Sequence, residues 1–428
     1  MSSVGVEPAT PTPAAPSLRR LITAGASWIF GSSIVRHGLR LVSSFVLTRM
    51  LTPDSFGLIA TAAILTTAIE MCSDFGVRHA IVHNPNGGTR RYLDVAWTLI
   101  VVRGLVIALL ILALAAPFAA ACGDDRVFGL ACLTALSPAL FGLCSPGRLR
   151  WSRDLRQDLL AKLDLYVDVV RLPINIACVW LVRSAMGLAL ATVATEVVRV
   201  VISYVMAPER PTWTWDRTIV RELGRYGRFV FASSLLGFLS VRLDAFFIAR
   251  FLGMEMAGIY YIAQALSGPV ESMGTQMLGG LLFPMLSRLQ HDPAAVRRRM
   301  MQTLRLLVFI ALPLVVVAIL LGPWAIRAFF PEGYAAAVPP FQALLAAAWM
   351  SCLGTALTCP LLASGRPYWG TVATTARLIA FCVAAYALSG YGTLGYALAI
   401  AAASTAFTLS IVFVPWTRPA AKAPVPAG

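Results

Sequence analysis

Long apolar runs recur along the whole chain and alternate with short polar segments rich in arginine. A helix that crosses the hydrocarbon core of a bilayer needs about 20 mostly apolar residues. The runs lack the period-two alternation of barrel strands, and only helices and closed barrels can span hydrocarbon. The pattern therefore predicts an all-α membrane protein with about twelve spanning helices, at residues 24–50, 56–81, 92–118, 127–145, 160–182, 186–207, 227–250, 256–286, 304–321, 335–363, 368–388 and 393–414.

The composition agrees with this pattern. Of the 428 residues, 58% are hydrophobic and 13% are charged, whereas about a quarter of the residues in a soluble globular chain are charged. The formal net charge is +15, which in a soluble protein would suggest a nucleic-acid partner. In a membrane protein, basic residues collect in cytoplasmic loops and meet anionic lipid. We therefore expect membrane lipids, and not nucleic acid, to contact these segments.

The arginine-rich loops all lie on one face if the amino terminus is cytoplasmic. The opposite face holds scattered single arginines, such as Arg126 and Arg327. Because basic residues favour the cytoplasmic side, both termini are predicted to be cytoplasmic. No predicted loop is long enough for a soluble domain, so any activity is expected within the membrane-embedded part. The loop arginines predicted to be cytoplasmic are Arg90, Arg91, Arg148, Arg150, Arg153, Arg156, Arg210, Arg217, Arg221, Arg225, Arg288, Arg297, Arg298, Arg299 and Arg366.

The two halves of the chain share an internal repeat at an offset of 201 residues. Phe45, Arg49, Leu51 and Gly57 match Phe246, Arg250, Leu252 and Gly258. Because six predicted helices separate the copies, both copies have the same orientation, as in two-lobed transporters. The predicted organisation is a disordered cytoplasmic tail (1–17), a six-helix lobe (18–207), a cytoplasmic linker (208–224), a second six-helix lobe (225–417) and a second tail (418–428).

The segments around the repeat resemble a known family. Residues 47–57 (LTRMLTPDSFG), 73–76 (SDFG) and 84–85 (NP) are similar to the first two helices of the polysaccharide (O-antigen and exopolysaccharide) flippases. Residues 244–253 (DAFFIARFLG), 257–260 (AGIY) and 282–290 (LFPMLSRLQ) are similar to the seventh and eighth helices of the same family. These flippases belong to the multidrug/oligosaccharidyl-lipid/polysaccharide exporter superfamily.

The resemblance implies a function as well as a fold. It implies a V-shaped pair of lobes around a central cavity, which moves undecaprenyl-diphosphate-linked oligosaccharides across a bacterial inner membrane by alternating access. The substrate would be the lipid-linked oligosaccharide of surface polysaccharide biosynthesis, and the protein would be a transporter and not an enzyme. The polysaccharide polymerase and the chain-length machinery are candidate partners.

Other functions remain open at this point. A drug/cation antiporter of the same superfamily would share the fold but would favour an acidic, aromatic cavity over intramembrane arginines. A peptidoglycan-precursor flippase is closer, although that group usually has more than twelve helices. A glycan polymerase or ligase would be expected to have a large periplasmic loop, and a structural scaffold would not need charges at symmetric positions in its helices.

Charged residues inside apolar helices are costly and therefore mark candidate sites. Arg36 and Arg40 lie four residues apart on one face of the first predicted helix, and Arg242 lies in the equivalent helix of the second lobe. Since a guanidinium group can bind phosphate oxygens in a bidentate manner, these three arginines are the candidate substrate-binding residues. The alternative interpretation is that they pair with acidic residues as fixed bridges between the lobes.

Acidic residues in the predicted helices form a second candidate set. A buried carboxylate can couple transport to protons or sodium, or it can form a static ion pair. We predict ion-coupling or lobe-bridging roles for Glu70, Asp74, Asp244 and Glu271. The eight cysteines lack CxxC pairs and zinc-like spacing, so no metal site is expected from them. We also predict no cofactor and no catalytic residue.

Overall fold

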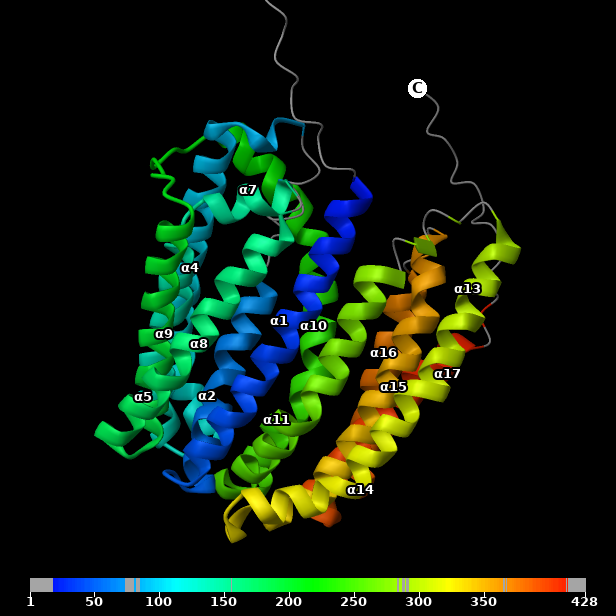
Figure 1. The fold of residues 1–428 in the computed structure, drawn as a ribbon. Helices are drawn as coiled ribbons and strands as arrows, with labels where there is room; N and C mark the ends of the chain where they lie inside the picture. Colours follow the sequence, from blue (N-terminus) through cyan, green and yellow to red (C-terminus); the bar gives the residue numbers. More distant parts are fainter. Residues whose placement is uncertain are drawn as a thin grey trace, which may run out of the picture.

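The computed structural model describes residues 18–73, 81, 85–154, 156–282, 285–286, 289, 292–364, 366, 368–412 and 414. Within these residues the regular elements are all helical, which confirms the predicted all-α class. The helices form two groups that correspond to the first and second halves of the chain (Figure 1). The groups lie close together where α2 and α11 begin, and they diverge toward the end at which α1 begins.

The first group, the N-lobe, ends at residue 206. Its elements are α1 (Leu18–Thr48), α2 (Pro53–Cys72), a 3-10 turn η1 (Pro85–Gly88), α4 (Arg90–Cys122), α5 (Arg126–Thr134), α6 (Leu136–Gly142), α7 (Gly147–Arg153), α8 (Gln157–Val182) and α9 (Ala185–Met206). Local signals set several boundaries. Pro53 occupies the first turn of α2, where a missing amide hydrogen costs nothing, and Ser184 caps α9 by accepting a hydrogen bond from the Met186 amide.

The second group, the C-lobe, begins at residue 217. Its elements are α10 (Arg217–Leu252), α11 (Met254–Met277), a π turn η2 (Leu278–Leu282), α13 (Pro293–Leu306), a π turn η3 (Leu307–Ala311), α14 (Leu312–Phe329), a 3-10 turn η4 (Glu332–Ala337), α15 (Val338–Ala363), α16 (Tyr368–Leu388), a 3-10 turn η5 (Ser389–Tyr391) and α17 (Gly392–Val412). Asp216 caps α10 and Asp292 caps α13. Helix α10 thus begins inside the segment expected to be a linker.

Each of the twelve predicted spans coincides with one or more of these helices. Among the described residues, seven helical segments are long and apolar enough to cross a membrane. There are eight if the segment formed by α5 and α6 counts as one span together with α7, from which it is separated by a bend of 65°. Helices α1, α10 and α11 fall outside that set, and they carry candidate charges that lower their mean hydropathy. The chain is therefore a multi-pass membrane protein, and the count of twelve crossings stays a prediction.

Large apolar side chains cover the outside of the helix groups. Leu109, Val205 and Leu320 are 66%, 76% and 70% exposed. In water such a surface would drive aggregation, whereas in a bilayer it faces lipid tails of the same polarity.

The lobes contact each other directly where α2 and α11 begin. A Cβ atom on Gly57 would overlap the main-chain carbonyl group of Met254, and one on Gly258 would overlap that of Pro53. Gly57 and Gly258, like Pro53 and Met254, are separated by the offset of the predicted repeat. The contact therefore places two segments that the predicted repeat would pair against each other, and it requires glycine on both sides.

Apolar and ionic contacts surround this backbone contact. The Tyr334 hydroxyl donates to the Leu51 carbonyl oxygen at 3.4 Å, and Arg126 pairs with both Asp54 and Asp124 at 2.7 Å. The hydrogen bond from Arg126 holds the pKa of Asp124 below its ordinary value. We call the buried apolar cluster at this end the plug; it consists of Leu47, Leu51, Phe56, Val179, Leu188, Ile262 and Tyr334.

The segment between the lobes is held against α4. The Thr212 hydroxyl donates to the buried Asp94 carboxylate at 2.6 Å, and Arg91 pairs with Asp216 at 2.8 Å. The Trp213 ring packs edge-on against Trp97, with 5.2 Å between ring centroids. The connection is thus ordered by specific contacts at the end of the N-lobe.

Candidate functional site

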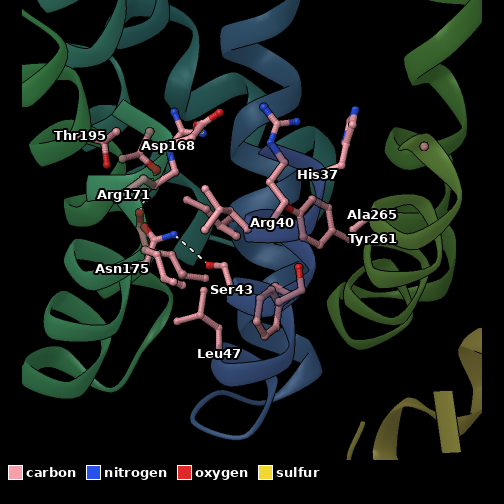
Figure 2. A pocket seen from close by; sticks show the side chains of 18 of the residues that line it. His37, Arg40, Ser43, Leu47, Asp168, Arg171, Asn175, Thr195, Tyr261 and Ala265 are labelled. Carbon is pink, nitrogen blue, oxygen red and sulfur yellow. Dashed lines mark hydrogen bonds and ion pairs between the residues drawn. The ribbon is translucent and has the colours of Figure 1, made fainter. Parts of the chain in front are cut away.

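A cavity of about 590 Å³ lies between the lobes, on the side of the plug that faces the start of α1. Its walls come from α1, α2, α8 and α9 of the N-lobe and from α10 and α11 of the C-lobe. A cavity that both lobes line can change shape when the lobes move relative to each other, as alternating access requires. Figure 2 shows its N-lobe wall, where side chains of α1 and α8 point into a common space.

Charged side chains occupy the part of the cavity far from the plug. The N-lobe contributes Arg40, Asp168, Arg171 and Glu196, and the C-lobe contributes Arg242. Two of the N-lobe charges lining the wall form a local pair, because Arg171 and Asp168 lie 2.8 Å apart. Glu196 is also neutralised, by Arg199 behind it at 2.9 Å.

Arg40 and Arg242 differ from these paired groups. Both line the cavity, one from each lobe, and neither forms an ion pair with another described residue. Neither guanidinium is therefore neutralised by a direct ion pair, and in a site with low-dielectric walls its attraction for an anion is stronger than in water.

Arg36 lies one turn from Arg40 but has a different environment. Its guanidinium contacts Asp164 on α8 at 3.7 Å and donates to Ser33 at 3.1 Å, and it is absent from the residues lining the cavity. Asp164 also accepts from Arg199 at 3.0 Å. Arg36 thus belongs to a network within the N-lobe, so this conformation separates it from the two cavity arginines with which the sequence grouped it.

Asp244 is fully buried in the C-lobe. One carboxylate oxygen accepts hydrogen bonds from the Tyr260 hydroxyl at 2.6 Å and from the Gln264 amide at 2.8 Å. The other oxygen has no hydrogen-bond partner among the described residues. Tyr260 and Gln264, with Arg242, also line a smaller cavity of about 250 Å³ between α2, α10 and α11. A buried carboxylate with an unsatisfied oxygen beside a cavity is suited to binding a proton or a small cation.

The remaining acidic candidates occupy separate places. Glu271 accepts from Ser351 at 2.6 Å and lies 3.7 Å from Arg377, within the C-lobe. Glu70 lies in α2, where its main-chain oxygen accepts from Arg103 at 2.7 Å. Asp74 lies outside the described residues. In this conformation, the described members of the acidic set form no ion pair between the lobes.

Hydrogen bonds between the lobes involve neutral groups and a histidine. Ser33 on α1 donates to Gln276 on α11 at 3.4 Å, and His37 lies 3.2 Å from the Ser272 hydroxyl. These contacts join α1 to α11 along one flank of the cavity. They are weaker than ion pairs and are therefore easier to exchange when the lobes move.

Several cavity residues were not selected from the sequence. Asp168, Arg171 and Glu196 are visible as charges in apolar helices, but only the fold shows that they face the same space as Arg40. Neutral lining residues, such as Asn175, give no comparable signal in the sequence. Among the described residues, no group of three or more His, Cys, Asp or Glu side chains could hold a metal ion.

Comparisons with known proteins agree with this architecture. A family profile described as polysaccharide biosynthesis protein matches residues 46–339. The chain is 21% identical to the teichuronic acid biosynthesis protein TuaB of Bacillus subtilis (strain 168), over 83% of this chain and 74% of that protein. It is 20% identical to the lipopolysaccharide biosynthesis protein WzxC of Escherichia coli (strain K12), over 82% and 71%.

Solved structures show the same fold at lower identity. The lipid II flippase MurJ, in an inward closed conformation, superposes with a TM-score of 0.69 and 11% identity, over 92% of this chain and 87% of that chain. An inward-facing multidrug resistance MATE family transporter of the MOP superfamily gives 0.61 and 16%, over 92% and 93%. The profile match covers well over half of the sequence, so the resemblance inferred from the sequence motifs is confirmed. The chain belongs to the polysaccharide biosynthesis protein family.

Proposed function

We propose that this protein is a flippase that moves undecaprenyl-diphosphate-linked oligosaccharide repeat units from the cytoplasmic to the periplasmic leaflet of a bacterial inner membrane. The relatives named for teichuronic acid and lipopolysaccharide biosynthesis support a role in surface polysaccharide production. The protein would bind and move its substrate without making or breaking covalent bonds, so it would not be an enzyme.

One observation carries the proposal: Arg40 and Arg242 line one cavity from opposite lobes, and neither forms an ion pair with a described acidic residue. A diphosphate carries negative charge that two guanidinium groups can bind through charge-assisted, bidentate hydrogen bonds. A drug or cation antiporter would instead need an excess of negative charge in this space. The excess here is positive, so an anionic substrate fits the cavity better.

The conformation suggests one stage of the transport cycle. The plug and the contact between Gly57 and Gly258 close the cavity at the end where α2 begins. If the amino terminus is cytoplasmic, as the loop arginines suggest, this closed end is periplasmic. The structure would then represent the state that receives substrate from the cytoplasmic leaflet, and separation of α2 from α11 would release it on the other side.

We propose that Asp244 couples this movement to a proton or sodium gradient. The carboxylate lies behind Arg242 on the same helix, and its partner Gln264 lines both cavities. A change in the ionic state of Asp244 would alter its hydrogen bonds to α11, which forms the C-lobe side of the closed end. Binding in the cavity and closure of that end would thus be linked through α10 and α11.

Deletion of the gene tests the proposal in the cell. We expect the deletion strain to lose surface polysaccharide and to accumulate lipid-linked repeat units in the inner leaflet, and plasmid-borne protein should restore export. Normal polysaccharide together with altered resistance to drugs or dyes would favour the antiporter and overturn the proposal.

A further inference from the structure

The lining of the central cavity changes along its depth. Helices α1 and α8 run toward the plug, because Leu47 and Val179 near their ends belong to it. Passing along α1 from Arg40, the lining residues are Ser43, Ser44 and then Leu47. Along α8, the polar lining residue after Arg171 is Asn175, with Leu172 between them (Figure 2). The cavity therefore passes from a charged level, through a neutral polar level, to an apolar floor.

The neutral level lies about one helical turn below the charged level. The step from Arg171 to Asn175 is four residues, or about 6 Å along the helix axis, and the step from Arg40 to Ser43 is about 4.5 Å. This spacing is comparable to the width of one pyranose ring. A group attached to a diphosphate at the level of Arg40 and Arg242 would therefore reach the neutral level with its first sugar.

The side chains at this level carry hydrogen-bonding capacity but no charge. The Asn175 amide donates to the Ser43 hydroxyl at 3.3 Å, which leaves an amide hydrogen and the carbonyl oxygen available for a ligand. The Thr192 hydroxyl donates to the Leu188 carbonyl oxygen at 2.9 Å, so its lone pairs can still accept. Sugar hydroxyl groups both donate and accept, and they match such a set.

An aromatic side chain completes the level from the C-lobe. Tyr261 is 38% exposed, lines the cavity, and stacks on the buried Phe56 with 6.2 Å between ring centroids and an angle of 20° between their planes. The stacked pair fixes the orientation of the tyrosine ring. An exposed, fixed ring of this kind offers an apolar face to the C–H face of a sugar.

From this layering we propose that the level formed by Ser43, Asn175, Thr192 and Tyr261 is a glycan subsite that selects the membrane-proximal sugars of the substrate. The inference rests on the proposed function, since it places the diphosphate at Arg40 and Arg242. It adds an orientation: the sugars point toward the plug and the diphosphate stays at the charged level. Selectivity among glycans then arises from neutral contacts, and affinity for the common lipid diphosphate arises from the arginines.

Binding to the purified protein in nanodiscs separates the two levels. The probes are undecaprenyl diphosphate without sugar and undecaprenyl-diphosphate-linked repeat units extracted from the native strain lacking this gene. The measured quantity is the glycan increment, defined as the ratio of the two affinities. We expect N175L and Y261L each to reduce this increment by about three- to tenfold, with affinity for the bare lipid unchanged, because each removes neutral contacts only. R40Q should weaken both probes by the same factor.

The control is Y386L, which makes the same change at a tyrosine that is 88% exposed on the outside of α16; its glycan increment should equal that of the parent protein. If Y261L fails to fold, Y261F keeps the ring and should retain most of the increment, while N175L still tests the level. An unchanged increment in N175L, with R40Q weakening both probes, would overturn the glycan subsite and leave the flippase proposal standing. No effect of R40Q on either probe would instead contradict the placement of the diphosphate.

Discussion

Two arginines on one face of α1 illustrate how tertiary contacts divide residues that look equivalent in sequence. Arg36 is matched by Asp164, whereas Arg40 faces the cavity without a partner among the described residues. A paired charge contributes mainly to the folded state, and an unpaired charge in a cavity is available to a ligand.

Substitution by glutamine should therefore affect the two arginines differently. R36Q removes one of the two cations that contact Asp164, whose carboxylate is 37% exposed and keeps its ion pair with Arg199. We therefore expect the free energy of unfolding to fall by about 1 kcal/mol or less. Export should be largely retained. R40Q should leave the unfolding temperature in detergent unchanged and abolish export, and R40K should restore export only in part. Equal stability losses in R36Q and R40Q would show that Arg40 is also a structural residue.

Asp244 allows a test of coupling that does not disturb packing. Asn has the same shape as Asp and can still accept from Tyr260 and Gln264, so D244N should fold and reach normal levels in the membrane. We expect its transport in vesicles to lose its response to an imposed proton or sodium gradient, whereas E255Q, at an exposed acidic residue of α11, should keep that response. A full gradient response in D244N would assign coupling to another group.

Charged site residues could be predicted from sequence because each costs free energy in an apolar helix and so stands out. The neutral residues of the cavity could not be predicted in this way. A neutral polar side chain such as Asn175 or Thr192 costs much less free energy in a membrane helix than a charge does, so it does not stand out. The partner of each charge was also beyond prediction: Arg36 pairs with Asp164 because α1 packs on α8, and no sequence spacing specifies that contact.

At the scale of helices, the contact between α2 and α11 depends on the absence of two side chains. Gly57 and Gly258 each face a main-chain carbonyl of the other lobe. We expect G57A or G258A to prevent full closure at this end and to shift the protein toward conformations open there, because the backbones must separate to admit a methyl group.

Labelling in whole cells measures this shift. S43C would place a thiol in the cavity, in a background without the eight native cysteines. G57A should make this thiol react faster with a membrane-impermeant maleimide added outside the inner membrane. G390A serves as the control, because a Cβ there meets no atom within 4 Å. Identical labelling in G57A and the parent protein would show that this contact does not control access.

The positions of the helices were predictable from apolar runs, but their irregularities were not. The span expected at residues 127–145 is divided between α5 and α6, and the chain bends by 65° before α7. The span expected at 304–321 belongs to a helical segment that begins at Ala294 and includes the π turn η3. Hydropathy gives the length of a run, whereas local bends depend on packing with neighbouring helices.

For the whole molecule, the charge of the loops predicts one topology. Reporter fusions after Arg90, Arg153, Arg217, Arg298 and Arg366 should all report cytoplasm, because each follows a basic loop. Fusions near Asp124 and Glu332 should report periplasm, at the end closed by the plug. A single inverted fusion inside the series would contradict the count of twelve crossings.

Transport by the purified protein tests the central claim most directly. Proteoliposomes would carry an undecaprenyl-diphosphate-linked disaccharide with a fluorescent group on its sugar, and a membrane-impermeant quencher would be added outside. We expect quenching to continue into the inner-leaflet pool when the parent protein is present, and to stop at the outer-leaflet pool with R40Q or R242Q, as in protein-free vesicles. Two results would contradict the proposed function. In the first, the inner-leaflet probe stays protected from the quencher with the parent protein, even under an imposed proton or sodium gradient. In the second, quenching of the inner-leaflet probe proceeds unchanged with both R40Q and R242Q.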